Sequence, residues 1–221
     1  MCNAYGYLAP IDKLIDSFRQ LDLPLRFDDG RVPNLQPRDL IRPTDPAPIL
    51  RARNPGEGAA AGLELVELRW WLIPFFHRGP VKAWKAMTTN ARAETIATTP
   101  AYREAYARRR CLVPATHFFE WTPLDPAKPK GLKQRWRVTA PGQEVFYFPG
   151  LWEQSRPSDH DDPLQSFTLA TCSAGEDVSP YHIRQPVILD AAAGAQWLDL
   201  SGPGEAQLRP PPAGTLTFTA D

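Results

Sequence analysis

The sequence is poor in the residues that mark several classes of protein. Among 221 residues there are only three cysteines and four histidines. Cys2, Cys111 and Cys172 have neither metal-ligand spacing nor the even number that a disulfide framework requires. No stretch approaches the roughly 18 consecutive apolar residues of a membrane span. We therefore expect a cytoplasmic monomer that has no metal or other cofactor and no contact with a membrane.

An excess of one charge is also missing, because 25 Lys and Arg residues balance 25 Asp and Glu residues. Bulk charge therefore gives no sign of polyanion binding, and a nucleic-acid contact would depend on a local patch. Glycine is scarce beside proline, with 14 residues against 25. Many prolines favour turns and extended connections, so we expect a strand-rich chain with one compact core.

The second residue offers unusual chemistry. Cys2 follows Met1 directly, so removal of Met1 would place a thiol and a free α-amine on adjacent carbons. The amine, with a reference pKa of roughly 7.7–8.0, is partly neutral near pH 7. Such a residue can condense with an aldehyde and close to a five-membered thiazolidine, or it can attack an ester or amide through sulfur alone. The alternative is a frayed terminal residue without function.

Apolar spacing predicts few helices and many strands. Helices are expected from Pro10 to about residue 21, from Pro100 to about Arg108 and from Ala191 to Leu200. Residues 24–62 contain seven prolines and are expected to be irregular. Strands are expected at 63–73, 111–114, 116–121, 134–139, 144–148, 151–153, 166–172 and 187–189, with 134–153 as an antiparallel meander. A tail from Gly202 is expected to be extended or partly disordered.

Two segments combine polar or aromatic side chains in a way that suggests a site. Extended geometry at 88–94 would place Asn90, Arg92 and Glu94 on one face and two alanines on the other. The alternative is that residues 88–94 form a solvated edge strand without a function. The aromatic stretch 70–76 supplies either core or a platform on which bases stack.

Two further segments carry groups that can transfer protons. Alternation at 116–121 places Glu120 among aromatic residues, where loss of hydration would raise its pKa. A surface carboxylate on a half-exposed strand fits the pattern equally well. His182 and Arg184 stand two residues apart before an apolar strand, so both can point into one cleft, although a lone histidine there is more often structural.

Four separated segments, in this order and spacing, resemble the SOS response-associated peptidase (SRAP) family. They are Met1-Cys2, the Asn-Ala-Arg-Ala-Glu-Thr run 90–95, the segment from Arg109 to Pro114 with Phe-Phe-Glu-Trp at 118–121, and the segment 182–189. The resemblance covers about residues 1–200. It implies an α+β fold with an antiparallel, barrel-like β core, a few flanking helices and long proline-rich loops. A single domain would span 1–200, with 201–221 as a tail.

The resemblance also implies a function in DNA damage and the SOS response. The family binds single-stranded DNA at abasic sites, and its exposed cysteine forms a thiazolidine DNA-protein crosslink with the ring-opened aldehyde. The implied activities include cleavage of the Met1-Cys2 bond, as in a thiol protease or other hydrolase, and a lyase activity. Carried over to this chain, Cys2 is the nucleophile, Asn90 positions the amine and sugar, Glu120 is the acid and base, and His182 is the second proton-transfer or electrostatic group.

The same resemblance assigns the DNA contacts. Arg92 and Arg184 would hold phosphates. The aromatic candidates for contact with bases are Trp70, Trp71, Phe75 and Phe76. The chain departs from the family at Asn3 and Ala4, where glycine and arginine are usual, and at Trp71 and His117, where glycine is usual. The arginine run 108–110 would replace the missing arginine or form a solvated face.

Two other functions remain open on the sequence. One is a cysteine peptidase or amidohydrolase that uses Cys2 with His182 on a peptide substrate. The other is a non-catalytic module that binds single-stranded DNA. A requirement for DNA, and a preference for abasic over intact strands, would separate these functions from abasic-site crosslinking.

Overall fold

The computed structural model describes residues 3–27, 30–54 and 58–221, so Cys2 and Met1 lie outside the described residues. The described chain builds two β-sheets. The first has the strand order β12-β8-β7-β1-β2. Its strands are β1 (Tyr5–Tyr7), β2 (Arg38–Ile41), β7 (His117–Pro123), β8 (Lys133–Thr139) and β12 (Thr217–Ala220).

The second sheet closes on itself. Its order is β11-β10-β4-β3-β6-β9, and β9 also pairs with β10, so five strands form a ring. Its strands are β3 (Pro46–Asn54), β4 (Gly58–Trp70), β5 (Asn90–Arg92), β6 (Arg110–Ala115), β9 (Phe146–Ser155), β10 (Leu164–Ser173) and β11 (Arg184–Pro186). The expected α+β class with an antiparallel, barrel-like β core is therefore confirmed. β4 and β5 pair in parallel with β10.

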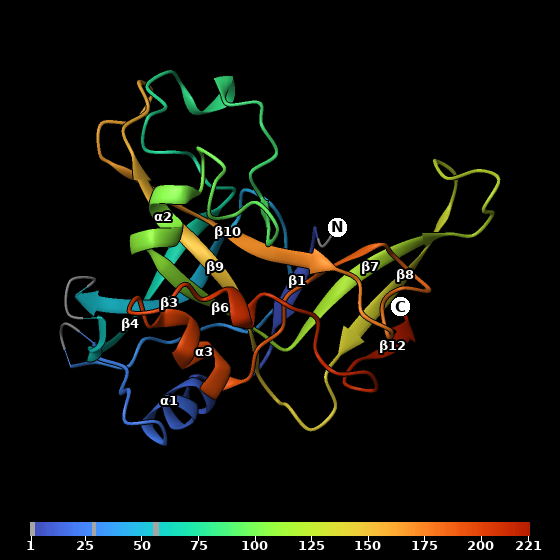
Figure 1. The fold of residues 1–221 in the computed structure, drawn as a ribbon, viewed down its shortest axis with the longest axis horizontal. Helices are drawn as coiled ribbons and strands as arrows, with labels where there is room; N and C mark the ends of the chain where they lie inside the picture. The colour runs from blue at the N-terminus through green and yellow to red at the C-terminus, as the bar shows by residue number, and fades with distance from the viewer. Residues whose placement is uncertain (1–2, 28–29, 55–57) are drawn as a thin grey trace.

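Three helices flank the sheets. They are α1 (Ile11–Arg19), α2 (Arg103–Arg108) and α3 (Ala191–Leu198), with short 3₁₀ turns η1 (Val81–Ala83) and η2 (Glu205–Gln207). Figure 1 shows α1 and α3 together on one side of the ring and α2 on another. Each helix lies inside the range that apolar spacing predicts. No helix among the described residues is both long and apolar enough to cross a membrane.

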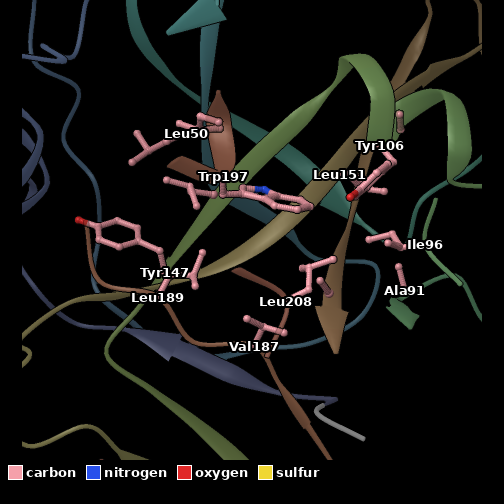
Figure 2. Close-up of a cluster of buried hydrophobic side chains, with 14 of the residues drawn as sticks. Leu50, Ala91, Ile96, Tyr106, Tyr147, Leu151, Val187, Leu189, Trp197 and Leu208 are labelled. Atoms are coloured by element: carbon pink, nitrogen blue, oxygen red, sulfur yellow. The ribbon is translucent and has the colours of Figure 1, made fainter. Parts of the chain in front are cut away.

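The core around α3 fixes one side of the ring. Trp197 is fully buried, and its Nε1 donates to the Cys111 carbonyl of β6 at 2.9 Å. Figure 2 shows Trp197 at the centre of the cluster, with Tyr106 and Leu151 beside it and Ala91 of β5 at its edge. Ala91 therefore turns inward, and the pleat turns its neighbours Asn90 and Arg92 the other way.

The expectation of irregular structure over 24–62 is wrong. This segment forms β2, β3 and the start of β4. Pro46 and Pro48 lie opposite Arg69 and Glu67 of β4, whereas the registered β3–β6 pairs begin at Leu50. Proline is tolerated in a strand where its missing N–H has no ladder partner. The two prolines therefore stand at the unpaired edge of β3 and do not interrupt it.

The predicted meander over 134–153 is also wrong. β8 belongs to the first sheet and β9 to the second. Pro149-Gly150 lies inside β9, opposite Leu112 and Cys111 of β6. A Cβ at Gly150 would stand 2.7 Å from the Thr168 carbonyl oxygen and 3.0 Å from Cys111 Sγ. This glycine therefore permits the close approach of β6, β9 and β10. The Pro-Gly pattern in the sequence instead predicts a turn here.

The last residues join the sheet that carries β7. β12 pairs antiparallel with β8 from Thr217 opposite Thr139 to Ala220 opposite Trp136. The Asp221 carboxylate lies 2.9 Å from Arg135 of β8. Residues 217–220 are therefore an extended strand of this sheet.

The arginine run 108–110 is divided between different environments. The Arg110 guanidinium is buried and donates to the carbonyl oxygens of Asp199, Gly202 and Pro203. Arg109 is paired with Glu153 at 2.8 Å. Arg108 alone is exposed. Arg110 therefore anchors the segment after α3 and is not free to replace the missing phosphate-binding arginine.

Candidate functional site

The N-terminal strand β1 lies beside the strand that carries Glu120. Tyr5 pairs with Phe118 and Gly6 with His117, and the Phe119 N–H donates to the Ala4 carbonyl at 2.9 Å. Extended by two residues beyond the pair Tyr5–Phe118, the same register would set Asn3 opposite Glu120. Figure 1 shows β1 next to β7, where the two sheets meet. The described chain therefore begins beside β7, with Asn3 exposed and Ala4 buried.

Glu120 is a buried carboxyl group. It is 2% exposed and lies in β7 opposite Trp136 of β8. Burial raises its pKa to about 7, against the lowering effect of the Trp121 backbone amide. The predicted placement of an acid among aromatic residues is therefore correct, and the alternative of a surface carboxylate is wrong. Both protonation states of Glu120 are populated near neutral pH.

Asn90 is the first residue of β5. Its side chain is 7% exposed, and its Nδ2 donates to Thr89 Oγ1 at 3.4 Å. Its carbonyl oxygen accepts from the hydroxyl of Tyr102 at 3.3 Å. β5 pairs in parallel with β10, with Asn90 opposite Leu169. These contacts hold Asn90 on a rigid strand, as a positioning group requires.

His182 lies in the turn that leads into β11. The Arg184 N–H donates to its Nδ1 at 2.9 Å, and the Arg184 carbonyl oxygen is also 2.9 Å from that nitrogen. Burial lowers the pKa of His182, and the positive charges of Arg184 and Lys133 act in the same direction. The ring is therefore neutral at neutral pH. Its Nδ1 can accept from the Arg184 N–H or, once protonated, donate to the Arg184 carbonyl.

The two predicted phosphate-binding arginines differ. Arg92 is exposed at the end of β5. Arg184 makes two parallel hydrogen bonds to the Glu94 carboxylate, both at 3.0 Å, and a third to the Thr171 carbonyl at 2.9 Å. This guanidinium lowers the pKa of Glu94. Arg184 is therefore engaged by a carboxylate, and Arg92 remains the better phosphate ligand.

The aromatic candidates also divide. Trp70 is fully buried, stacks with Phe167 and donates from Nε1 to the Thr89 carbonyl at 2.9 Å. Trp70 is thus a core residue, and its assignment to DNA contact is corrected. Phe75 and Phe76 are 41% and 43% exposed, with their rings edge to face at 5.5 Å. These two rings can meet a base.

Trp71 has an unusual backbone. Its φ of 120° lies in a region that glycine adopts and that L side chains rarely adopt. Its N–H donates to the Phe167 carbonyl at 3.0 Å, and its indole Nε1 donates to the Ala86 carbonyl at 3.0 Å. Such a conformation costs on the order of 1–3 kcal/mol. The strain of this φ for any residue with a side chain accounts for the glycine that the resemblance leads us to expect at this position.

A chain of contacts connects the candidates to β1. The Tyr5 ring meets Trp70 edge to face at 5.2 Å, and Trp70 holds the carbonyl of Thr89, the residue before Asn90. On the other side Trp136, opposite Glu120, meets the ring of Tyr181 at 5.0 Å, and Tyr181 precedes His182. Asn90, Glu120 and His182 are therefore each supported by the packing around the start of β1. Cys2, the predicted nucleophile, lies outside the described residues.

Sequence reasoning missed two parts of this region. One is the Glu94–Arg184 pair, which joins residues far apart in the chain and has no local signal. The other is a cavity beside Trp71 that includes Trp84, Lys82 and Lys85. Four Lys and Arg residues and three tryptophans between 69 and 85 are a weak signal for it. Among the described residues no group of three or more His, Cys, Asp or Glu side chains is placed to hold a metal ion.

Comparison with known proteins identifies the same family over nearly the whole chain. A family model described as SOS response associated peptidase (SRAP) matches residues 1–219. Abasic site processing protein YoaM of Bacillus subtilis is 32% identical over 200 residues, which cover 90% of this chain and 79% of that protein. Abasic site processing protein HMCES of Gallus gallus is 28% identical over 181 residues, covering 72% of this chain and 53% of that protein.

Solved structures show the same fold. A protein from Bacteroides thetaiotaomicron superposes with a TM-score of 0.80 at 22% identity, covering 99% of this chain and 91% of that one. A protein from Bordetella bronchiseptica superposes with a TM-score of 0.74 at 25% identity, covering 100% of this chain and 99% of that one. Because the family model spans both sheets and every candidate residue, the chain belongs to the SOS response associated peptidase (SRAP) family.

Proposed function

We propose that this protein processes abasic sites in single-stranded DNA by forming a covalent crosslink through Cys2. The observation that carries the proposal is the pairing of β1 with β7, in which Ala4 bonds to Phe119 and the register sets Asn3 opposite Glu120. Cys2 is the next residue along the chain. We infer that Glu120, a carboxyl group with a pKa of about 7, serves the amino thiol of Cys2 as its acid and base. The names of relatives such as YoaM support this substrate.

The first chemical step opens the sugar. An abasic deoxyribose is mainly a closed hemiacetal, and only its open form has the aldehyde. Glu120 donates a proton to the ring oxygen as the C1′ hydroxyl proton leaves, and this needs a group that both gives and takes a proton near pH 7. Exposed carboxylates with pKa values near 4 would be almost fully ionised and poor donors.

The second step forms two bonds to the aldehyde carbon. After Met1 is removed, the Cys2 amine adds to C1′, and the carbinolamine loses water to give an imine. The Cys2 sulfur then adds to the imine carbon, its proton goes to the nitrogen, and a thiazolidine forms with water as the only other product. We assign to His182 the delivery of a proton to the leaving carbinolamine hydroxyl, with its ring oriented by the contacts of Nδ1 with the Arg184 backbone.

The remaining residues position the reactants. Asn90 orients the amine and the sugar from its fixed place on β5, Arg92 binds a phosphate, and Phe75 and Phe76 contact a base. Bringing amine, thiol and aldehyde together removes much of the entropic cost of their encounter. The same thiol can attack the Met1-Cys2 carbonyl, which is the peptidase activity we propose for this site. An imine that forms without closure of the ring would permit strand cleavage as a lyase.

The test is crosslinking of purified protein to a single strand with one abasic site. We expect an adduct that survives denaturation in wild type and in Cys172→Ala, whose thiol is buried beside the Glu94 segment. Cys2→Ala should give none. An unchanged adduct in Cys2→Ala would reject the proposal. Intact mass must first show that Met1 is absent, since a blocked amine cannot form the ring.

The same preparation separates the alternatives. A cysteine peptidase using Cys2 and His182 would cleave peptides in trans without DNA. A non-catalytic module would bind intact and abasic strands equally and leave no covalent product. Either result, obtained with protein whose Cys2 amine is free, would replace the crosslinking proposal.

A further inference from the structure

A cavity of about 440 Å³ lies beside the strained residue Trp71. We call it the Trp71–Trp84 pocket. Its lining comes from Arg69 at the end of β4, from Trp71 and Ile73 just after β4, from η1 with Trp84 and Lys85 that follow it, and from Asp159. This size falls within the roughly 300–1,000 Å³ of ligand pockets.

Both indoles of the pocket are held in place. Trp71 donates from Nε1 to the Ala86 carbonyl, and Trp84 donates from Nε1 to Thr88 Oγ1, each at 3.0 Å. The polar edges of the two rings are therefore satisfied by protein. Trp84 also meets the rings of Phe76 and His77 edge to face at 6.0 and 5.5 Å. Both indoles are half-buried and line the pocket, and stacking is the contact that unpaired nucleobases make with such aromatic side chains.

The charge of the pocket favours an anion. Arg69, Lys82 and Lys85 supply three cations against the carboxylate of Asp159. That carboxylate already accepts from the Val81 N–H at 2.9 and 3.1 Å. Arg69 Nη1 donates to the Trp71 carbonyl at 3.0 Å and so supports the unusual peptide. The two lysines are exposed, and their flexible ammonium groups suit a phosphate at the rim.

The pocket adjoins the segment that ends at Asn90. Trp84 bonds to Thr88, Thr88 Oγ1 donates to the Leu72 carbonyl at 2.6 Å, and Trp70 bonds to the carbonyl of Thr89. Asn90 follows directly. A strand whose abasic sugar lies at Asn90 would therefore pass a neighbouring nucleotide close to this wall.

We propose that the Trp71–Trp84 pocket binds an intact, unpaired nucleobase of the same single strand, with Lys82 and Lys85 holding its phosphate. The proposal rests on the proposed function for the identity of the strand. Independent support comes from the backbone of Trp71, whose φ of 120° is strained for a tryptophan but not for glycine. A strained tryptophan at this position indicates that its side chain has a function.

The experiment measures binding without crosslinking chemistry. All variants carry Cys2→Ala, and fluorescence anisotropy gives Kd values for two labelled ten-nucleotide probes, oligo(dT) and a strand of tetrahydrofuran spacers that has phosphates but no bases. Trp71→Gly removes one indole and fits the backbone. We expect it to weaken oligo(dT) binding about 5- to 100-fold and spacer binding less than about 2-fold.

Three further variants keep the test decisive. Trp84→Leu should show the same loss on oligo(dT), so the result does not depend on the folding of Trp71→Gly. Lys82→Gln with Lys85→Gln should weaken both probes equally and reduce the slope of log Kd against log salt by about 1.4. Leu132→Ala, which removes another exposed apolar side chain on the β7–β8 loop, should change neither probe.

The outcomes are separable from those of the crosslinking test. Equal losses on both probes in Trp71→Gly and Trp84→Leu would overturn base stacking and leave a phosphate site only. No loss on either probe would overturn the pocket as a DNA site. Because the probes contain no reactive aldehyde and the protein no Cys2 thiol, failure of the crosslinking proposal would leave these binding results unaffected.

Discussion

Two buried glutamates occupy comparable positions in the two sheets. Glu120 in β7 is 2% exposed and Glu153 in β9 is 3% exposed, and burial raises the pKa of both. Glu153 accepts from Arg109 at 2.8 Å and from the Gln154 N–H at 2.9 Å, and both contacts lower its pKa. For Glu120 the effect of burial is the larger one, and its pKa is raised to about 7. The arginine that pairs with Glu153 marks that carboxyl as structural, whereas a pKa near neutrality suits Glu120 to proton transfer.

The largest expected difference between the two glutamates is in the rate of crosslinking. Glu120→Gln removes the group that opens the sugar, so adduct formation should slow about 10²- to 10⁴-fold. Glu153→Gln, the matched control, should change the rate less than about 3-fold. Single-turnover kinetics with an abasic strand measure both. Equal rates in wild type and Glu120→Gln would mean that Glu120 only fills space.

The second difference is in the pH dependence of stability. The folded-state pKa of Glu120 is raised from 4.5 to about 7, so the folded protein binds this proton more tightly than the unfolded chain. The group therefore disfavours folding progressively as pH rises from about 4.5 to 7, by roughly 3 kcal/mol once both states are ionised. Glu120→Gln should remove this loss.

Urea denaturation at pH 5 and pH 8.5 checks that expectation. The free energy of unfolding of Glu120→Gln should exceed that of wild type at pH 8.5 and approach it at pH 5. A variant that is less stable than wild type at the higher pH would show that the ionised carboxylate is better solvated than its burial implies.

The smallest expected effect comes from making Glu153 resemble Glu120. Arg109→Met removes the paired cation and keeps the aliphatic length of the side chain. The pKa of Glu153 should rise further, and stability at pH 8.5 should fall by about 1–3 kcal/mol, because an ionised carboxylate loses its charged hydrogen bond. At pH 5 the loss should be smaller, since protonation relieves it. The same urea measurements apply, and an equal loss at both pH values would point to lost packing.

The sequence predicts Glu120 well because its signal is local. Alternation among bulky aromatic neighbours determines both burial and its consequence for the pKa. Asn90 and His182 are equally visible, because each belongs to a short run that resembles the family. Helices are placed correctly for the same reason, since three- and four-residue spacing is a property of a single segment.

What the sequence does not predict depends on partners far along the chain. The sequence of Pro149-Gly150 predicts a turn, but in the structure these residues lie inside β9, between β6 and β10. The sequence predicts Arg184 as a phosphate ligand, but in the structure its guanidinium donates two hydrogen bonds to Glu94, which lies 90 residues earlier. Trp70 and Trp71 are adjacent and chemically identical, yet one is core and the other lines a pocket, because only the second has the φ that redirects its side chain.

The pairing of β1 has a consequence for the order of events during synthesis. Its strand partners are β2 and β7, and β7 begins more than 100 residues later at His117. Contacts so distant in sequence form slowly and only after the later strand has left the ribosome. Throughout that interval β1 can pair only with β2, and we expect the segment before Tyr5 to stay open to an aminopeptidase. Removal of Met1, which the crosslinking proposal requires, can thus precede the pairing of β1 with β7.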